Sequence, residues 1–347
     1  MPKGKQKNKS LKKYIATFMA VLCLVMLGLG WWLYSSAYEQ YDGTEDVMIT
    51  IPPNSDYSQI EDSLVAKTGD YGHSVLRMLK LRNYKPATKI GIYRISPGDK
   101  AWSVSSRIKS HNVATIRLTY NNIRLLEDLA KKIAVKFPWD DTDFIQACAR
   151  VLPHYGFDTP EKYPAAFLPD TYEFYADATP DKVVETLVEH RNKFWNEERR
   201  AKAYSLGLTP VQVSTIASIV EEETANKSEQ STVARLYLNR YHKGMKLQAD
   251  PTVKFALKDF GLKRLRQKHL ETPSPYNTYQ TAGLPPGPIR IAEKTTMEAV
   301  LNAPENEFLY MCAKPDGSRT HNFAKDYATH QKNAAAYRKW IDSLGIF

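Results

Sequence analysis

Alternating apolar residues followed by apolar residues at helical spacing recur three times after residue 46. Segment 47–53 leads into a helical pattern over 55–69, 90–96 leads into 100–111, and 114–120 leads into 123–137. Strands that alternate with short helices are typical of α+β modules. The pattern predicts an α+β fold class, with a small non-catalytic module over residues 35–120.

The chain from residue 121 to 347 is expected to form a second, mostly helical domain with short strands. One helix is predicted over 179–207, with Thr179 as its N-cap and Gly207 beyond its end. The next begins at Thr209, which forms a capping box with Gln212. Its apolar pattern continues to residue 225.

The N-terminal segment has the pattern of a membrane anchor. Residues 14–34 contain no charged side chain, and about 20 apolar residues in a helix cross a bilayer. Six lysines precede this span, within residues 1–13, and acidic residues follow it, which favours a cytoplasmic N-terminus. The alternative is a signal peptide cleaved near Ala37, but the apolar run is longer than a usual signal core. Both interpretations export residues 35–347, so the chain is expected at the plasma (inner) membrane as a single-pass protein whose catalytic domain is periplasmic or extracellular.

Charge and cysteine content exclude some functions. The net charge is +10, and removing the six lysines of residues 1–13 leaves +4 for the other 334 residues. A net charge of +4 over these residues is too small to indicate the basic surface of a nucleic-acid-binding protein. Cys148 and Cys312 are expected to be buried and unpaired, although a single disulfide between them stays open. His321 and His330 lack the partner spacing of a metal site, so no metal or cofactor is expected.

The helix that begins at Thr209 carries the candidate chemistry. Its apolar positions Val213, Ile216, Ala217 and Val220 fall on one stripe, which is expected to face the core. Three glutamates follow at positions 221–223: the middle one is predicted to face solvent, and the outer two lie on the flanks of the stripe. A carboxyl at the edge of an apolar face has a raised pKa, which suits a general acid. Helical geometry alone does not choose between the two flanking glutamates.

Long motifs make the second domain similar to a known family. Ala217–Thr224, Asn239–Val253 and Ser274–Ile289 resemble motifs of the endolytic murein transglycosylases, the MltG or YceG-like family. Residues 169–172 and the histidine run 321–330 also match, and the resemblance spans roughly 170–330. The family layout, an anchor and a LysM-like module before the catalytic domain, fits the chain.

The resemblance implies cleavage of the MurNAc–GlcNAc β-1,4 bond inside nascent peptidoglycan strands, which leaves 1,6-anhydro-MurNAc ends and terminates strand elongation. It implies that the first glutamate of the family's E-x-E pair, Glu221, is the acid. Its other implied partners are the membrane and peptidoglycan synthases. The residues predicted to bind the glycan are Glu223, Asn239, Arg240, Gln248, Asp250, Thr252, Ser274, Tyr276, Asn277, Thr278, His321 and His330.

Two alternatives remain open at this stage. The first is a hydrolase that uses two carboxylates, Glu221 with Glu223 or Asp250. The second is a non-catalytic scaffold that binds the cell wall. Residues 248–252 are expected to form a polar turn, since Pro251 disfavours a continued helix before it.

Overall fold

The structure is a computed structural model that describes residues 4–345. The chain divides into two compact units, one of residues 1–116 with 175–177 and one of residues 117–174 with 178–347. Residues 1–3 of the predicted cytoplasmic tail lie outside the described residues.

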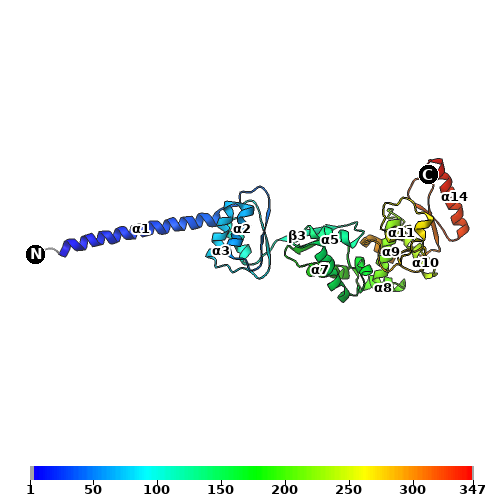
Figure 1. Cartoon of the computed structure of the whole chain (residues 1–347), viewed down its shortest axis with the longest axis horizontal. Helices are drawn as coiled ribbons and strands as arrows, with labels where there is room; N and C mark the ends of the chain where they lie inside the picture. The colour runs from blue at the N-terminus through cyan, green and yellow to red at the C-terminus, as the bar shows by residue number, and fades with distance from the viewer. Residues whose placement is uncertain (1–3, 346–347) are drawn as a thin grey trace. The chain divides into compact units, whose positions relative to one another are not determined.

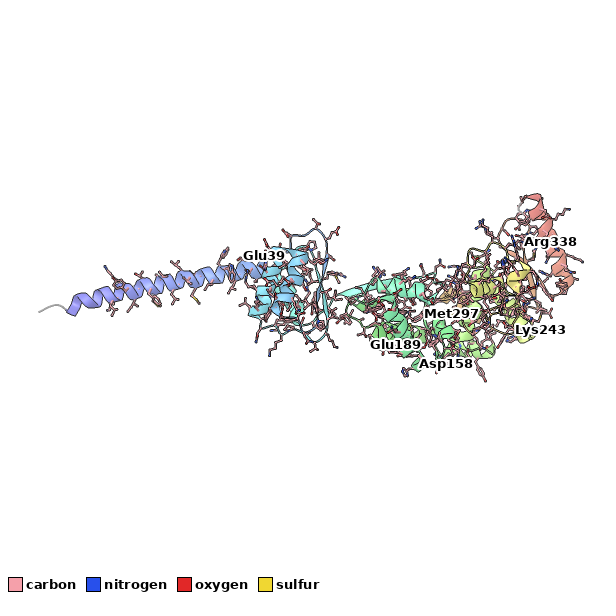
Figure 2. All side chains as sticks on the ribbon, viewed as in Figure 1. Glu39, Asp158, Glu189, Lys243, Met297 and Arg338 are labelled. Atoms are coloured by element: carbon pink, nitrogen blue, oxygen red, sulfur yellow. The ribbon has the colours of Figure 1, made fainter. Side chains whose placement is uncertain are left out.

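The first unit begins with a long helix, α1 (Gly4–Tyr38). Within it, Leu11–Tyr38 is long and apolar enough to cross a membrane. An 18-residue stretch of this segment has a mean hydropathy of 2.1, and none of that stretch is buried. Figure 2 shows side chains projecting from both edges of Leu11–Tyr38, and most of the large apolar side chains in this segment are exposed. The helix therefore has the composition and exposure expected of either an anchor or a signal segment.

The rest of the first unit places two helices between two strands. These are β1 (Val47–Ile51), α2 (Tyr57–Thr68), α3 (Asp70–Leu81) and β2 (Gly91–Ile95), followed by α4 (Ala101–Lys109). The strands pair antiparallel, with Ile49 opposite Tyr93. Their inward side chains and those of α2, α3 and α4 form one apolar core. The two strands, α2 and α4 agree with the sequence pattern, whereas α3 was not predicted.

The second unit is mainly helical and holds the remaining elements, except for the first two residues of β3 and the last residue of β4. The strands β3 (Thr115–Tyr120) and β4 (Asp170–Tyr175) pair with each other, as do β5 (Tyr310–Ala313) and β6 (His321–Ala324). The helices are α5 (Leu126–Ala134), α6 (Asp141–Val151), α7 (Pro180–Phe194), α8 (Glu197–Ser205), α9 (Pro210–Glu223), α10 (Gln230–His242), α11 (Asp250–Leu257), α12 (Gln267–Leu270), α13 (Lys294–Leu301) and α14 (Tyr327–Ser343), with short 3₁₀ helices at Leu152–Tyr155 and Pro160–Ala166. The chain thus mixes helix and strand, as expected.

Two sequence predictions in this unit are wrong. The helix predicted over 179–207 is two helices, α7 and α8, because the buried Trp195 ends the first and the side chain of Asn196 caps the second. The predicted polar turn over 248–252 contains the start of α11, since Asp250 and Pro251 occupy its first turn, where proline is tolerated.

Helix α9 lies at the centre of the second unit. It packs against α8, α10, α11 and α13, and Figure 1 shows the first three around it. The predicted capping box of Thr209 and Gln212 is present. Every residue from Val213 to Val220 is buried, so the predicted core stripe is confirmed, but the burial extends around the whole helix. The glutamates at the end of α9 therefore emerge inside the unit.

Candidate active site

Glu221 is held in a pocket of polar contacts beside α13. Its Oε1 lies 3.0 Å from Nη2 of Arg290, and its Oε2 accepts the backbone N–H of Glu293 at 2.9 Å. Burial raises the pKa of this carboxyl, and the two contacts work against that shift. The Glu221 carboxylate thus has two polar partners, and its side chain is 11% exposed to solvent.

Glu222 does not face solvent, which corrects the sequence prediction. Its carboxylate accepts hydrogen bonds from Arg124 at 2.7 Å and from Arg290 at 2.7 Å, and its side chain is 18% exposed. Arg290 also donates to Asn122 at 2.7 Å. The helical wheel was misleading because it places a residue relative to one apolar stripe, whereas α9 is enclosed on all sides.

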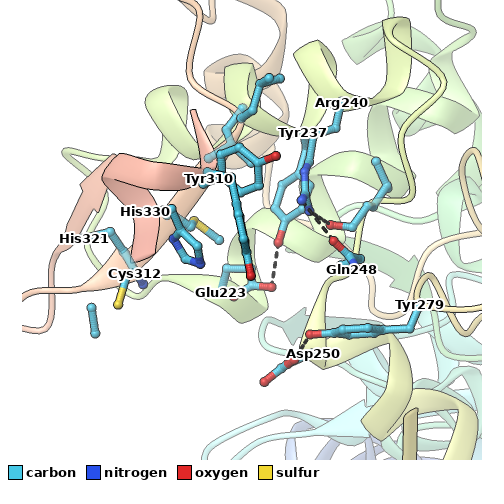
Figure 3. A pocket seen from close by; sticks show the side chains of 16 residues that line it. Glu223, Tyr237, Arg240, Gln248, Asp250, Tyr279, Tyr310, Cys312, His321 and His330 are labelled. Atoms are coloured by element: carbon cyan, nitrogen blue, oxygen red, sulfur yellow. Dashed lines mark hydrogen bonds between the residues drawn. The ribbon is translucent and has the colours of Figure 1, made fainter. Parts of the chain in front are cut away.

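Glu223 is the only one of the three glutamates that lines the cavity between the end of α9 and the β5–β6 hairpin, hereafter the α9 cavity. This cavity has a volume of about 370 Å³ and opens beside the end of α9 (Figure 3). The Tyr237 hydroxyl donates a hydrogen bond to Oε1 of Glu223 at 2.7 Å. Burial, assisted by the negative charge of Asp250, raises the pKa of Glu223 to about 7. A carboxyl that titrates near neutrality is suited to proton transfer in both directions.

The walls of the cavity come from four parts of the second unit. Helix α10 contributes Tyr237 and Arg240, the start of α11 contributes Asp250, and the β5–β6 hairpin and α14 close the opposite side. Tyr279 donates a hydrogen bond to Oδ1 of Asp250 at 2.6 Å. The lining therefore combines aromatic faces with polar groups, as carbohydrate and other ligand sites do.

Six of the twelve predicted substrate-binding residues line this cavity. They are Glu223, Arg240, Gln248, Asp250, His321 and His330. Arg240 is fixed by hydrogen bonds to the carbonyl of Leu247 at 2.5 Å and to Oε1 of Gln248 at 3.0 Å. His330 stacks on Tyr310, and burial lowers its pKa, so this ring is neutral near pH 7.

The other six predicted residues lie outside the cavity, and three of them are completely buried. The Thr252 and Thr278 hydroxyls bond each other at 2.8 Å, and the Asn277 amide donates to two backbone carbonyls of its own loop. Polar side chains that satisfy buried backbone groups support the fold. The sequence prediction that these residues bind substrate is not supported by their position.

The remaining three of this group also have partners within the protein. The amide of Asn239 donates to the carbonyls of Asn306 and Phe308. Ser274 accepts the N–H of Tyr276, whose ring packs on Phe255 with centroids 4.6 Å apart. These contacts explain the residues as supports of the loops around α10 and α11.

The sequence analysis missed several residues of the cavity. Tyr237, Tyr279, Tyr310 and Tyr327 contribute aromatic faces, and Cys312 lies beside them as a free thiol. Tyr237 and Tyr310 carry no distinctive motif, and the count of 21 tyrosines was the only available signal. Cys148 is buried and free, as expected, whereas Cys312 is free but only partly buried, which corrects the prediction that both are buried.

The fold and the cavity define an α+β protein with a cluster of partly buried carboxylates at the end of a central helix. A family model described as the YceG-like family matches residues 49–336, and the chain belongs to that family. The resemblance seen in the motifs is thereby confirmed.

Named relatives and a solved structure agree with this assignment. The chain is 28% identical over 321 residues to the endolytic murein transglycosylase of Bacillus subtilis, covering 84% of this chain and 87% of that protein. It is 25% identical over 173 residues to the endolytic murein transglycosylase of Streptococcus pneumoniae D39, covering 49% of this chain and 31% of that protein. A crystal structure of a YceG-like protein from Listeria monocytogenes aligns with a TM-score of 0.54 at 25% identity, covering 84% of this chain and 99% of that one.

The bridging position of Glu222 leads to a prediction about stability. Glu222→Gln removes the charge that Arg124 and Arg290 share, so we expect the free energy of unfolding to fall by about 2 kcal/mol, measured by urea denaturation. The matched control is Glu198→Gln, which removes an exposed carboxylate paired with Lys202 four residues later. The control is expected to leave the free energy of unfolding nearly unchanged, because an exposed ion pair contributes little to stability. Equal stability of the Glu222 variant and the wild type would contradict the prediction.

Proposed function

We propose that this chain is an endolytic lytic transglycosylase that cuts the MurNAc–GlcNAc β-1,4 bond within peptidoglycan strands. The observation that carries the proposal is the position of Glu223, a partly buried carboxyl that lines the α9 cavity and whose pKa is raised to about 7 by desolvation. Membership of the YceG-like family and similarity to relatives named endolytic murein transglycosylases support this reaction class.

The geometry favours Glu223 over Glu221 as the acid. Glu221 was the sequence-based choice, but its two oxygens are occupied by Arg290 and the Glu293 amide, and it does not line the cavity. Glu223 lines the cavity and has a neutral hydroxyl, that of Tyr237, as its hydrogen-bond partner. A nearby guanidinium favours the ionised form of a carboxyl, whereas a neutral partner in a buried site permits protonation.

The mechanism follows from one carboxyl that acts twice. Protonated Glu223 donates its proton to the glycosidic oxygen, and the bond to the anomeric carbon breaks as charge develops there, with the substrate's own N-acetyl group assisting. The ionised Glu223 then takes the proton of the MurNAc C6 hydroxyl, whose oxygen closes the 1,6-anhydro ring. Tyr237 stabilises the ionised form between these steps, because burial raises the pKa of its phenol and keeps it a donor.

A two-carboxylate hydrolase remains the second candidate, because Asp250 lines the same cavity as Glu223. In such an enzyme one carboxyl is the acid and the other activates water or attacks the sugar. Asp250 already accepts a hydrogen bond from Tyr279, which orients its carboxylate. The two candidates differ in the source of the oxygen at the new strand end.

The remaining parts of the chain extend the proposal. We infer that α1 is a retained anchor in the plasma membrane with a cytoplasmic N-terminus, and that residues 35–120 and 121–347 are the exported module and catalytic domain. The β1–α2–α3–β2 order, with antiparallel strands, supports a LysM-like assignment of the module. An enzyme so anchored would cut nascent strands next to peptidoglycan synthases and terminate their elongation.

The first prediction compares two isosteric substitutions. Glu223→Gln keeps the shape of the side chain but removes the transferable proton, so we expect a loss of at least ~100-fold in turnover of purified glycan strands. Glu221→Gln is the matched control two residues away and is expected to retain most of the turnover. The reverse ranking would restore Glu221 as the acid.

The second prediction concerns pH. Because the first step needs protonated Glu223, kcat/KM is expected to fall as pH rises through about 7. The charge of Asp250 contributes to the raised pKa, so Asp250→Asn should move this decline to lower pH. An unchanged position of the decline in the Asp250 variant would separate Glu223 from the titration.

The third prediction concerns the product. The lytic route leaves 1,6-anhydro-MurNAc ends, each lighter by one water than a hydrolytic end, since an intramolecular hydroxyl competes well with bulk water. Digestion in oxygen-18 water followed by mass spectrometry should therefore show no label at the new anomeric carbon. Stoichiometric label there would establish the hydrolase with Glu223 and Asp250. Fragments of intermediate length should precede terminal disaccharides if cleavage is internal.

A further inference from the structure

A second buried carboxylate, Glu229, contacts the wall of the cavity from outside. Its Oε1 lies 2.8 Å from Nδ1 of His321, and its Oε2 accepts the backbone N–H of the same histidine at 3.1 Å. The Thr224 hydroxyl donates to Oε1 at 2.6 Å. The side chains of Glu229 and His321 are only 10% and 15% exposed, so these bonds are protected from water.

These contacts define the charge of Glu229. Burial opposes ionisation, but the hydrogen bonds from Thr224 and His321 outweigh it and lower the pKa of Glu229. An ionised carboxylate can accept a hydrogen bond but cannot donate one. It therefore bonds the Nδ1 of a histidine only when Nδ1 carries a proton. Neutral His321 is therefore held as its Nδ1–H tautomer.

The other ring nitrogen of His321 is available to a ligand. His321 lines the α9 cavity together with Glu223 and Tyr310, and Figure 3 shows His321 on the side of the β5–β6 hairpin. Among residues 4–345, no hydrogen-bond partner is found for its Nε2. In the Nδ1–H tautomer, Nε2 is an acceptor, and it would bind a hydrogen-bond donor such as a sugar hydroxyl or an acetamide N–H.

We propose that Glu229 is a positioning residue that fixes the His321 tautomer, and that His321 Nε2 accepts one hydrogen bond from the glycan. The proposal rests on the assignment of this cavity as the glycan site. Glu229 also connects the two sides of the cavity, because Thr224 directly follows Glu223, the last residue of α9, and His321 begins β6.

The tautomer is tested by nitrogen-15 NMR of the full chain in nanodiscs, with labelled histidine and His321→Ala for assignment. We expect the proton on Nδ1 at neutral pH in the wild type. Glu229→Ala should release the ring to the Nε2–H form that free imidazole side chains prefer, and Glu229→Gln should largely retain Nδ1–H through its amide oxygen. A doubly protonated ring, or an Nε2–H ring in the wild type, would overturn the proposal.

The link to the glycan is tested by a double-mutant cycle in the Glu223→Gln background, where bound strands are not cut. Glu229→Ala and His321→Ala should each weaken binding of purified glycan strands about 10-fold, and the double variant should lose no more than either single one. Independent, additive losses would assign Glu229 a purely structural role. Unchanged binding in the His321 variant would remove His321 from the glycan site.

A control variant and two kinds of glycan strand complete the binding experiment. Glu307→Ala removes an exposed carboxylate that contacts Lys325 just after β6 and should alter neither the tautomer nor binding. Binding of N-acetylglucosamine strands and of glucose strands distinguishes an acetamide N–H donor from a hydroxyl donor. If the donor is the acetamide N–H, His321→Ala should weaken binding of the N-acetylglucosamine strands but not of the glucose strands. If the donor is a hydroxyl, His321→Ala should weaken binding of both. Continued strand cleavage in the Glu223→Gln background would refute the proposed acid while leaving the NMR test intact.

Discussion

The partial burial of three consecutive carboxylates at the end of α9 is the constraint on which the site depends. Transfer of a carboxylate from water into a protein interior is costly unless a partner compensates it. Arg290 contacts both Glu221 and Glu222, and Arg124 contacts Glu222. No cation lies within ion-pair distance of Glu223 among residues 4–345, and it has the Tyr237 hydroxyl instead. Desolvation therefore outweighs the hydrogen bond from Tyr237 and the positive charge of Lys254, and the pKa of Glu223 is raised to about 7.

The surrounding polar core explains how this carboxyl is held beside the cavity. Ser218, one turn before the glutamates, accepts the backbone N–H of Ile289 at 3.0 Å and so connects α9 to the segment that bears Arg290. Thr278 donates to or accepts from Thr252 and accepts the Ala249 N–H, which fixes the start of α11 and hence Asp250. Such satisfied buried networks specify one arrangement of the chain, and they leave few side chains free to move. Motif residues such as Thr252 and Thr278, which the sequence predicted to bind glycan, instead support the residues that line the cavity.

Local patterns predicted the parts of the fold that depend on local chemistry. The Thr209 capping box, the apolar positions from Val213 to Val220 and the alternation at 47–51 are properties of short segments, and each is present. The break at Trp195 and the enclosure of Glu222 depend on contacts with distant residues, so no pattern within one helix revealed them. For the same reason helical spacing could not choose between Glu221 and Glu223, whose environments differ through Arg290 and Tyr237, 69 and 14 positions away from them.

The ionisation behaviour of Glu223 bears on which reaction suits the cavity. In a lytic transglycosylase one group first gives a proton and later takes one, so both of its forms must be accessible at the working pH. A pKa about 7 meets that requirement without a second catalytic carboxyl. Asp250 then has an electrostatic role, because its charge helps to hold the pKa of Glu223 high while Tyr279 keeps it oriented. A hydrolase would instead require Asp250 to act on the anomeric carbon or on a water beside it, and the source of the oxygen at the new strand end distinguishes the two reactions.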